Sequence, residues 1–294
     1  MKKLFDGVGI AIATPFKYNK VDYASLKKLI NKGIKEGASA IIVLGTTGEG
    51  STISAKERAE ILHFCRQIIP PKVKMIVGTG NNNFTLAMQN TITAKQAGAD
   101  GVLVVTPYYN KTTQRGLVEY YKRLATLQIP IIMYNVPART GLNIDLATVE
   151  QIIKENPYVY GIKEATCDIN RIMQLCQICQ DKIAVYSGED DLNFLFYCLG
   201  ADGTISVTAN SFTKQTVDVY KLVKQEKLKE AFSLHQKLSP INKMMFCETN
   251  PIPVKYFLKQ MDIIALDEVR MPLVELSPQN KEKIDEMLEE IKID

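Results

Sequence analysis

Eight short apolar segments, each followed by an amphipathic pattern, constrain the fold of this chain more than any other feature. The segments lie at residues 8–14, 40–45, 74–80, 101–107, 130–135, 159–165, 183–188 and 203–207. Helical patterns follow at residues 23–36, 55–69, 85–97, 113–126, 146–155 and 190–199. Continuous apolar strands suit a parallel sheet covered on both faces. Eight β/α units therefore predict an α/β fold, a closed (β/α)8 TIM barrel in preference to an open sheet.

Two further features define the domain organisation. A Rossmann fold would place a glycine-rich turn after the first strand, where Thr14-Pro15-Phe16 stands instead. Strand patterns stop near residue 213, and helical patterns at 215–238, 252–259 and 278–293 fill the remainder. We therefore predict a catalytic barrel over residues 1–224 and a small C-terminal helical appendage over residues 225–294.

The composition excludes several classes of partner. The chain has 36 basic and 32 acidic residues, a net charge of +4, and no basic patch with interleaved aromatic residues, so we expect no nucleic acid. No segment approaches the roughly 20 apolar residues that span a bilayer, and the N-terminus lacks an apolar stretch of signal-peptide length. Six scattered cysteines fit reduced thiols. We expect a soluble cytoplasmic protein with no membrane partner.

Cys176 and Cys179 form a CxxC motif, but its context argues against a metal site. The motif lies within a helical pattern at residues 171–179, and the two histidines, His63 and His235, are distant in the sequence. A structural zinc site needs about four ligands, commonly from a second cluster. We expect buried cysteines on a helix face and no metal.

Lys163 stands at the end of the sixth apolar segment, where a charged side chain is costly. Burial disfavours the ammonium form of an amine, and a neutral amine attacks a carbonyl to form a Schiff base. Lys163 is therefore a candidate for imine catalysis. The alternative is a structural lysine whose head reaches water or pairs with an acid such as Glu164.

Other strand ends carry groups suited to the same rim, since barrel enzymes build their active sites at the C-terminal ends of strands. Residues 45–50 read Gly-Thr-Thr-Gly-Glu-Gly, in which two hydroxyls and free backbone N–H groups could hold a carboxylate; a plain glycine turn is the alternative. The later strand ends add Tyr108, Tyr109, Tyr134 and Arg139. Each could be a packing or ion-pairing residue alone, but together they favour imine chemistry.

These segments resemble the pyruvate-dependent class I aldolase and lyase family, and within it the dihydrodipicolinate synthase branch, from residue 7 to about residue 259. The matching elements are Gly45-Thr46-Thr47-Gly48-Glu49, Thr106-Pro107-Tyr108-Tyr109-Asn110, Tyr134-Asn135-Val136-Pro137 with Arg139-Thr140-Gly141, Gly161-Ile162-Lys163-Glu164-Ala165, Ser187-Gly188, Gly203-Thr204-Ile205-Ser206-Val207 and Asn250-Pro251-Ile252-Pro253-Val254-Lys255. Seven ordered matches are far more specific than any single motif.

The resemblance implies a condensation of pyruvate with L-aspartate 4-semialdehyde in lysine and diaminopimelate biosynthesis. Lys163 would form the imine, and Thr46, Tyr134 and Tyr109 would relay protons, with Tyr109 reaching in from a neighbouring subunit. The substrate-binding residues would be Thr47 for the pyruvate carboxylate, Arg139 for the semialdehyde carboxylate, and Gly188 and Ile205 for the pocket wall. The family needs no metal or organic cofactor, and it forms homo-oligomers, mostly tetramers of two tight dimers.

Two alternative functions and one regulatory expectation bear on this interpretation. A lyase for 2-keto-3-deoxy sugar acids would share Lys163, but sialic-acid lyases of the family generally lack an arginine at position 139 and carry serine at position 46. A catalytically inactive barrel would have no need for a buried amine. Feedback by lysine is expected to be weak or absent: Asn82 and Tyr108 match the inhibited members, whereas Ala55, Arg58 and Leu86 depart from them.

Overall fold

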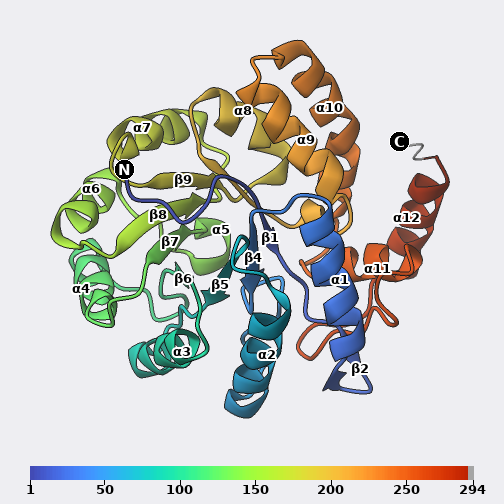
Figure 1. Ribbon diagram of the computed structural model, residues 1–294, viewed down its shortest axis with the longest axis horizontal. Helices are drawn as coiled ribbons and strands as arrows, with labels where there is room; N and C mark the ends of the chain where they lie inside the picture. Colours follow the sequence, from blue (N-terminus) through green and yellow to red (C-terminus); the bar gives the residue numbers. More distant parts are fainter. Residues whose placement is uncertain (291–294) are drawn as a thin grey trace.

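The computed structural model describes residues 1–290 and contains a closed barrel of eight parallel strands ringed by helices (Figure 1). The barrel closes because β1 pairs with both β10 and β4, which leaves no free edge. Its strands, in barrel order, are β1 Gly7–Ala11, β10 Gly203–Ser206, β9 Ala184–Ser187, β8 Val159–Glu164, β7 Ile131–Asn135, β6 Gly101–Val105, β5 Lys74–Gly78 and β4 Ala40–Val43. The prediction of a TIM barrel is confirmed, with each strand somewhat shorter than its apolar segment.

The strands read as continuous apolar runs because both of their faces are buried. In β4, Ala40 and Ile42 face the barrel interior, where they join a cluster that includes Ile76 and Leu103. The intervening Ile41 and Val43 belong to the larger cluster between the sheet and the helices. Side chains that alternate across a strand therefore fill two separate cores, as the barrel requires.

The helices of the barrel begin at identifiable caps. Asp22 accepts hydrogen bonds from two backbone N–H groups at the start of α1, and Ser54 forms a capping box with Glu57 at the start of α2. The bounds are α1 Tyr23–Lys35, α2 Ala55–Ile68, α3 Phe84–Gln96, α4 Gln114–Ala125, α6 Leu146–Glu155, α7 Ile169–Cys179, α8 Asn193–Cys198 and α9 Thr213–Lys224. Sequence periodicity did not predict the hairpin of β2 Phe16–Lys17 and β3 Lys20–Val21, the short helix α5 Pro137–Thr140, or the 3-10 turn η2 Thr208–Asn210. The helical pattern at residues 190–199 is divided into the 3-10 turn η1 Asp190–Leu192 and α8.

The single helix predicted over residues 215–238 is wrong. Two helices, α9 and α10 Leu228–Met244, meet there and pack against each other. Glu226 between them has a φ of 61°, and the Lys227 N–H turns back to the carbonyl of Leu222. This left-handed turn ends α9, although neither residue is the glycine that usually announces such a turn.

The C-terminal helices α10, α11 Ile252–Gln260 and α12 Pro278–Glu290 lie beside α1 and α9 on one flank of the barrel (Figure 1). Positions 291–293 of the predicted last helix lie outside the described residues. The division of the chain at residue 224 stays a prediction. None of the described helices combines the length and apolar character that a bilayer crossing needs.

A buried ion pair ties this C-terminal segment to the barrel. The ammonium group of Lys255, on α11, bonds the carboxylate of Glu49, and neither side chain is appreciably exposed. The backbone N–H of Arg270 donates to the same carboxylate at 2.9 Å, and Lys255 Nζ donates to the carbonyl of Glu268 at 2.8 Å. Burial lowers the pKa of Lys255 to about 8, against the opposing attraction of Glu49. Both charges are thus desolvated, and each charged group makes two hydrogen bonds.

Replacing Lys255 with methionine should lower the free energy of unfolding by about 3–5 kcal/mol, because Glu49 would keep its charge without a counterion. The matched control is Lys259→Met, which breaks the half-exposed 3.1 Å pair with Asp267 and should cost less than about 1 kcal/mol. Denaturant unfolding of both variants measures the difference. Equal losses would contradict the importance of the buried pair.

Candidate active site

Lys163 lies inside the barrel near the C-terminal end of β8, and its side chain is 5% exposed. The parallel register of β7 and β8 sets Tyr134 directly opposite Lys163. As a result, the amine nitrogen lies 4.4 Å from the centre of the Tyr134 ring. An amine and a phenol therefore share one end of the barrel interior.

Glu164 does not pair with Lys163, so this part of the structural alternative is wrong. Glu164 is the next residue along β8, and its side chain points to the opposite face of the strand. There it accepts hydrogen bonds from Arg171 Nε at 3.0 Å and from Asn135 Nδ2 at 2.9 Å. Within residues 1–290, no hydrogen bond or ion pair engages the amine of Lys163. This leaves the nitrogen free to react with a carbonyl carbon.

Above the amine lies a cavity of about 290 Å³. This volume, near the lower end of the range for small-molecule sites, suits small organic acids. The lining combines apolar walls with a few polar groups, contributed by Thr46, Thr47, Tyr134, Arg139, Lys163, Gly188, Glu189 and Asn250. The structure thus brings together six of the eight residues proposed from the sequence.

The loop that follows β4 presents Thr46 and Thr47 between two residues in left-handed conformations, Leu44 with φ 57° and Glu49 with φ 50°. Such backbone conformations are costly for residues other than glycine and persist only where the surroundings fix them. Here the Glu49 carboxylate is fixed by Lys255. Thr47 is buried, whereas Thr46 is open to the cavity.

Gly188, directly after β9, is required by the lysine. A Cβ at this position would lie 2.8 Å from Cε of Lys163, 2.9 Å from Cβ of Ala165 and 3.0 Å from the carbonyl oxygen of Glu164. These distances are shorter than van der Waals contacts, and one neighbour is backbone. The missing side chain therefore leaves the space that the Lys163 side chain occupies.

The two remaining proposed residues lie elsewhere. Ile205, on β10, is 1% exposed and packs within the barrel interior, below the cavity lining. Tyr109 is 92% exposed, has a φ of 67°, and lines neither cavity of its own chain near the site. Its own subunit therefore does not hold Tyr109 over Lys163.

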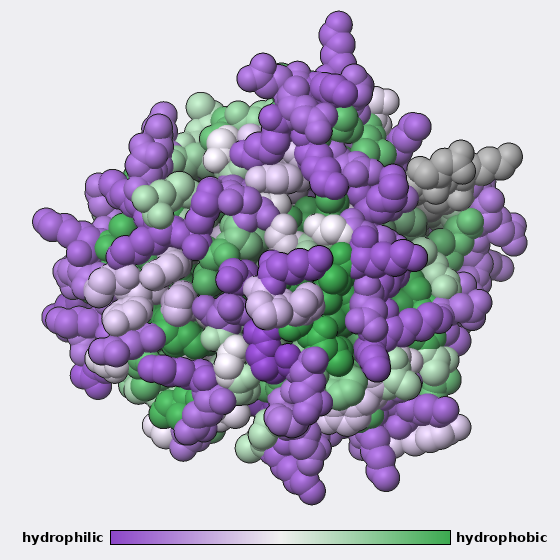
Figure 2. All heavy atoms as spheres, in the orientation of Figure 1, coloured by the Kyte–Doolittle hydropathy of each residue, from purple (hydrophilic) through white to green (hydrophobic). Residues whose placement is uncertain are grey.

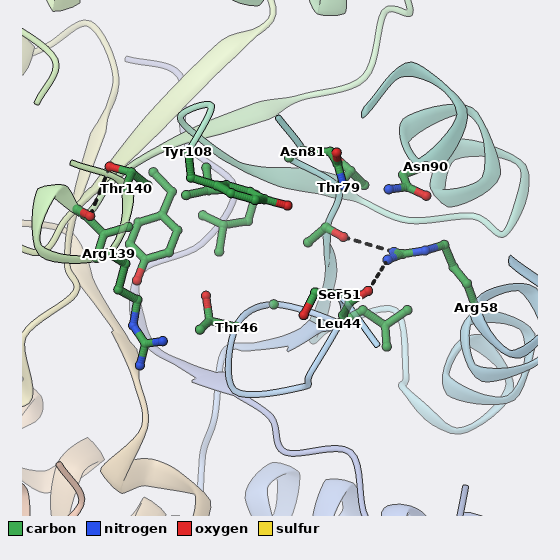
Figure 3. A pocket seen from close by; sticks show the side chains of 18 residues that line it. Leu44, Thr46, Ser51, Arg58, Thr79, Asn81, Asn90, Tyr108, Arg139 and Thr140 are labelled. Carbon is green, nitrogen blue, oxygen red and sulfur yellow. Dashed lines mark hydrogen bonds between the residues drawn. The ribbon is translucent and has the colours of Figure 1, made fainter. Parts of the chain in front are cut away.

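A second cavity of about 260 Å³ adjoins the first and shares Thr46, Tyr134 and Arg139 with it. Figure 3 shows Arg139 and Arg58 at opposite sides of this cavity, with Tyr108 between them. The buried Arg58 guanidinium donates to the carbonyls of Gly50 at 3.0 Å and Gly78 at 3.1 Å. Burial lowers the pKa of Arg58. A fixed cation therefore stands at the outer wall of the site.

The CxxC cysteines are thiols on a helix. Burial raises the pKa of Cys176 to about 11 and that of Cys179 to about 12, which disfavours the thiolate that metals bind. Among residues 1–290, no three His, Cys, Asp or Glu side chains are arranged to hold a metal ion.

Sequence reasoning did not select Glu189 and Asn250, although both line the cavity. Burial and the adjacent Asp190 raise the pKa of Glu189, while Lys163 opposes that shift. The only sequence feature that pointed to Glu189 was its place after the seventh apolar segment. Asn250 is the first residue of the last matching motif. Candidate residues were selected at the ends of strands, and this motif follows the last of the eight strands.

Comparison with known proteins adds independent evidence. The model of the Dihydrodipicolinate synthetase family matches residues 4–291. The 4-hydroxy-tetrahydrodipicolinate synthase of Thermodesulfovibrio yellowstonii is 44% identical over 286 residues, 97% of this chain and 98% of the relative. The crystal structure of dihydrodipicolinate synthase from Thermotoga maritima aligns with a TM-score of 0.95 at 40% identity, covering 97% of this chain and 98% of that one. The chloride-inhibited dihydrodipicolinate synthase from Acinetobacter baumannii, complexed with pyruvate, aligns at 0.94 and 39% identity, covering 97% and 98%.

Gly188→Ala should reduce borohydride trapping of pyruvate on Lys163 at least tenfold, because the new methyl group displaces the Lys163 side chain. Mass spectrometry of the reduced adduct measures this loss. The variant Gly188→Ala with Ala165→Gly serves as control: it relieves one contact but keeps those to Lys163 and Glu164, so it should stay impaired. Normal trapping by Gly188→Ala would contradict this assignment.

Proposed function

The chain belongs to the dihydrodipicolinate synthetase family. We propose that the cavity at Lys163 is the active site for the synthase reaction after which its relatives are named. The protein is a lyase that forms a carbon–carbon bond. It condenses pyruvate with L-aspartate 4-semialdehyde to give 4-hydroxy-tetrahydrodipicolinate, in lysine and diaminopimelate biosynthesis. The observation that carries this conclusion is the buried, unpaired amine of Lys163 in a cavity sized for small acids.

Lys163 begins the reaction by adding to the keto carbon of pyruvate, and loss of water gives a protonated imine. The positive nitrogen withdraws electrons and acidifies the methyl group, so one methyl proton leaves and an enamine forms. The enamine carbon attacks the aldehyde carbon of the second substrate. The amine of that substrate then attacks the imine carbon, closes the ring and releases Lys163.

Two groups bind the carboxylates. Thr47, buried at the cavity wall, offers its hydroxyl and the N–H groups of its loop to the pyruvate carboxylate. Arg139, which lines the same cavity, pairs with the carboxylate of the semialdehyde, for which the planar guanidinium is well shaped. Gly188, directly after β9, completes the pocket wall, while Ile205 on β10 packs in the barrel interior.

Proton transfer requires a relay, for which we propose Tyr134, Thr46 and Tyr109. A neutral phenol is a weak base, so hydrogen bonding through Thr46 is needed to pass the proton along. Tyr134 and Thr46 line the cavity of one chain. The exposure of Tyr109 supports its entry into the site of a second copy. The proposed assembly is a homo-oligomer, a tetramer of two tight dimers.

Several observations favour this reaction over the alternatives. Arg139 provides a carboxylate partner that sugar-acid substrates do not require at this position, and Thr46 accompanies it. A catalytically inactive barrel would have no use for an amine left unpaired inside the protein. Arg58 places a cation where inhibited relatives carry other side chains, which supports weak or absent inhibition by lysine. Free thiols at all six cysteines support a cytoplasmic location.

The first test is turnover of pyruvate with aspartate 4-semialdehyde, coupled to a downstream reductase whose cofactor oxidation reports ring formation. Turnover should be abolished in Lys163→Ala, and borohydride should trap pyruvate on the wild type alone. Trapping without turnover would keep the imine and redirect the second substrate to a sugar acid. Absence of both would overturn the proposed function.

A second test addresses the shared site. Tyr109→Phe and Lys163→Ala should each be nearly inactive alone, whereas co-refolding them should restore up to about a quarter of wild-type turnover through mixed two-fold dimers. In such a dimer, one site receives both Lys163 and the partner's intact Tyr109. As a control, Lys163→Ala co-refolded with a double variant lacking both groups should stay inactive. No recovery in the mixed sample would argue against Tyr109 acting across the interface.

A further inference from the structure

Asn250, in the turn before α11, contacts both of the groups that we assign to carboxylate binding. Its side-chain Nδ2 donates to Oγ1 of Thr47 at 3.0 Å, and its backbone carbonyl accepts from Nη2 of Arg139 at 3.3 Å. Asn250 is 4% exposed and lines the cavity with both partners. A single residue from beyond the barrel strands therefore connects the two groups through hydrogen bonds.

The direction of the first hydrogen bond determines what Thr47 can do. A hydroxyl has one proton to donate and two lone pairs to accept with. Because the amide of Asn250 donates, it occupies a lone pair of Thr47 and leaves the proton available. Among residues 1–290, no hydrogen bond has Thr47 Oγ1 as its donor. The free proton suits an anion, and the Asn250 amide strengthens it by polarising the hydroxyl.

Asn250 is itself held firmly in place. Five residues further along, Lys255 is locked to Glu49, which lies two residues after Thr47 on the substrate-binding loop. The segment from Asn250 to Lys255 therefore contacts the loop twice, through Thr47 and through Glu49. One buried atom stays unsatisfied: Oδ1 of Asn250 has no hydrogen-bond partner among residues 1–290. Keeping such an atom buried is costly, which is expected where a side chain serves a site.

We propose that Asn250 is a positioning residue that holds the Thr47 hydroxyl as a proton donor toward the pyruvate carboxylate and anchors Arg139 at a fixed separation from it. This role rests on the proposed function. It extends the active site into the C-terminal segment. The residue touches neither reacting carbon, so its effect should fall on pyruvate binding more than on the chemical steps.

Asn250→Ala removes the amide donor but keeps the backbone carbonyl that faces Arg139. Without the amide, the Thr47 hydroxyl should lose its hydrogen bond to the charged pyruvate carboxylate, so the Michaelis constant for pyruvate should rise about tenfold. The Michaelis constant for the semialdehyde should change less than about twofold. Asn250→Asp should raise the pyruvate constant further, because a carboxylate would capture the Thr47 proton and repel the substrate. General disruption of the site would instead raise both constants together and lower kcat.

A double-mutant cycle separates positioning from packing. In a Thr47→Ala background, Asn250→Ala should add little to the loss of pyruvate affinity, since its partner is already absent. The matched control is Asn156→Ala, a buried asparagine at the end of α6 that donates to the carbonyl of Ile152 and should leave pyruvate affinity unchanged in both backgrounds. Circular dichroism checks that each variant is folded.

The outcomes are distinguishable. Additive losses from Asn250→Ala and Thr47→Ala, or an unchanged pyruvate constant in Asn250→Ala, would overturn the positioning role alone, provided that the wild type traps pyruvate with borohydride. Failure of the wild type to trap pyruvate would overturn the proposed function and this inference with it. Non-additive losses confined to pyruvate would support the inference.

Discussion

The parallel register of β7 against β8 is the constraint on which the site depends. It sets Tyr134 opposite Lys163 and Asn135 opposite Glu164. Because side chains alternate across a strand, the first pair faces the barrel interior and the second faces the helices. The inner pair is the chemical centre of the proposed reaction, while the outer pair joins Arg171 in a buried polar network. A slip of one residue would bury Glu164 inside the barrel and turn the amine outward.

The separation of side chains onto the inner and outer faces of β8 also explains how the Lys163 amine can remain unpaired inside the protein. The nearby acid, Glu164, is satisfied by Arg171 and Asn135 on the outer face, so it is not available to neutralise Lys163. Space for the lysine side chain comes from the absence of a side chain at Gly188. The Lys163 amine is thus kept available by two absences: it has no acidic partner, and no side chain at position 188 fills its space. Figure 2 shows a mostly polar surface with scattered apolar residues on the face it presents.

Local sequence patterns were sufficient to predict the barrel, because each strand is a continuous apolar run and each helix has its own periodicity. They also predicted that Lys163, Tyr134 and Arg139 lie at the same end of the barrel, and all three line one cavity. Interactions between distant segments were not predictable in this way. The turn at Glu226 lacks a glycine, so the pattern suggested one continuous helix. Asn250 is separated from Thr47 by 203 positions, and only the folded chain brings them within 3.0 Å.

The C-terminal segment therefore does more than pack against the barrel: it also contacts residues of the cavity and of the loop after β4. Lys255 holds the strained loop through Glu49, and Asn250 reaches Thr47 and Arg139 within the cavity. A barrel alone supplies strand ends, but the loops after them need external support to keep residues such as Glu49 in a left-handed conformation. The buried charge of Lys255 and the buried amide of Asn250 supply that support here. An apolar side chain in place of Asn250 could not fix the direction of the Thr47 hydroxyl proton. Asn250 follows the eighth barrel strand by more than forty residues, yet it lines the same cavity as the strand-end residues Thr47 and Lys163.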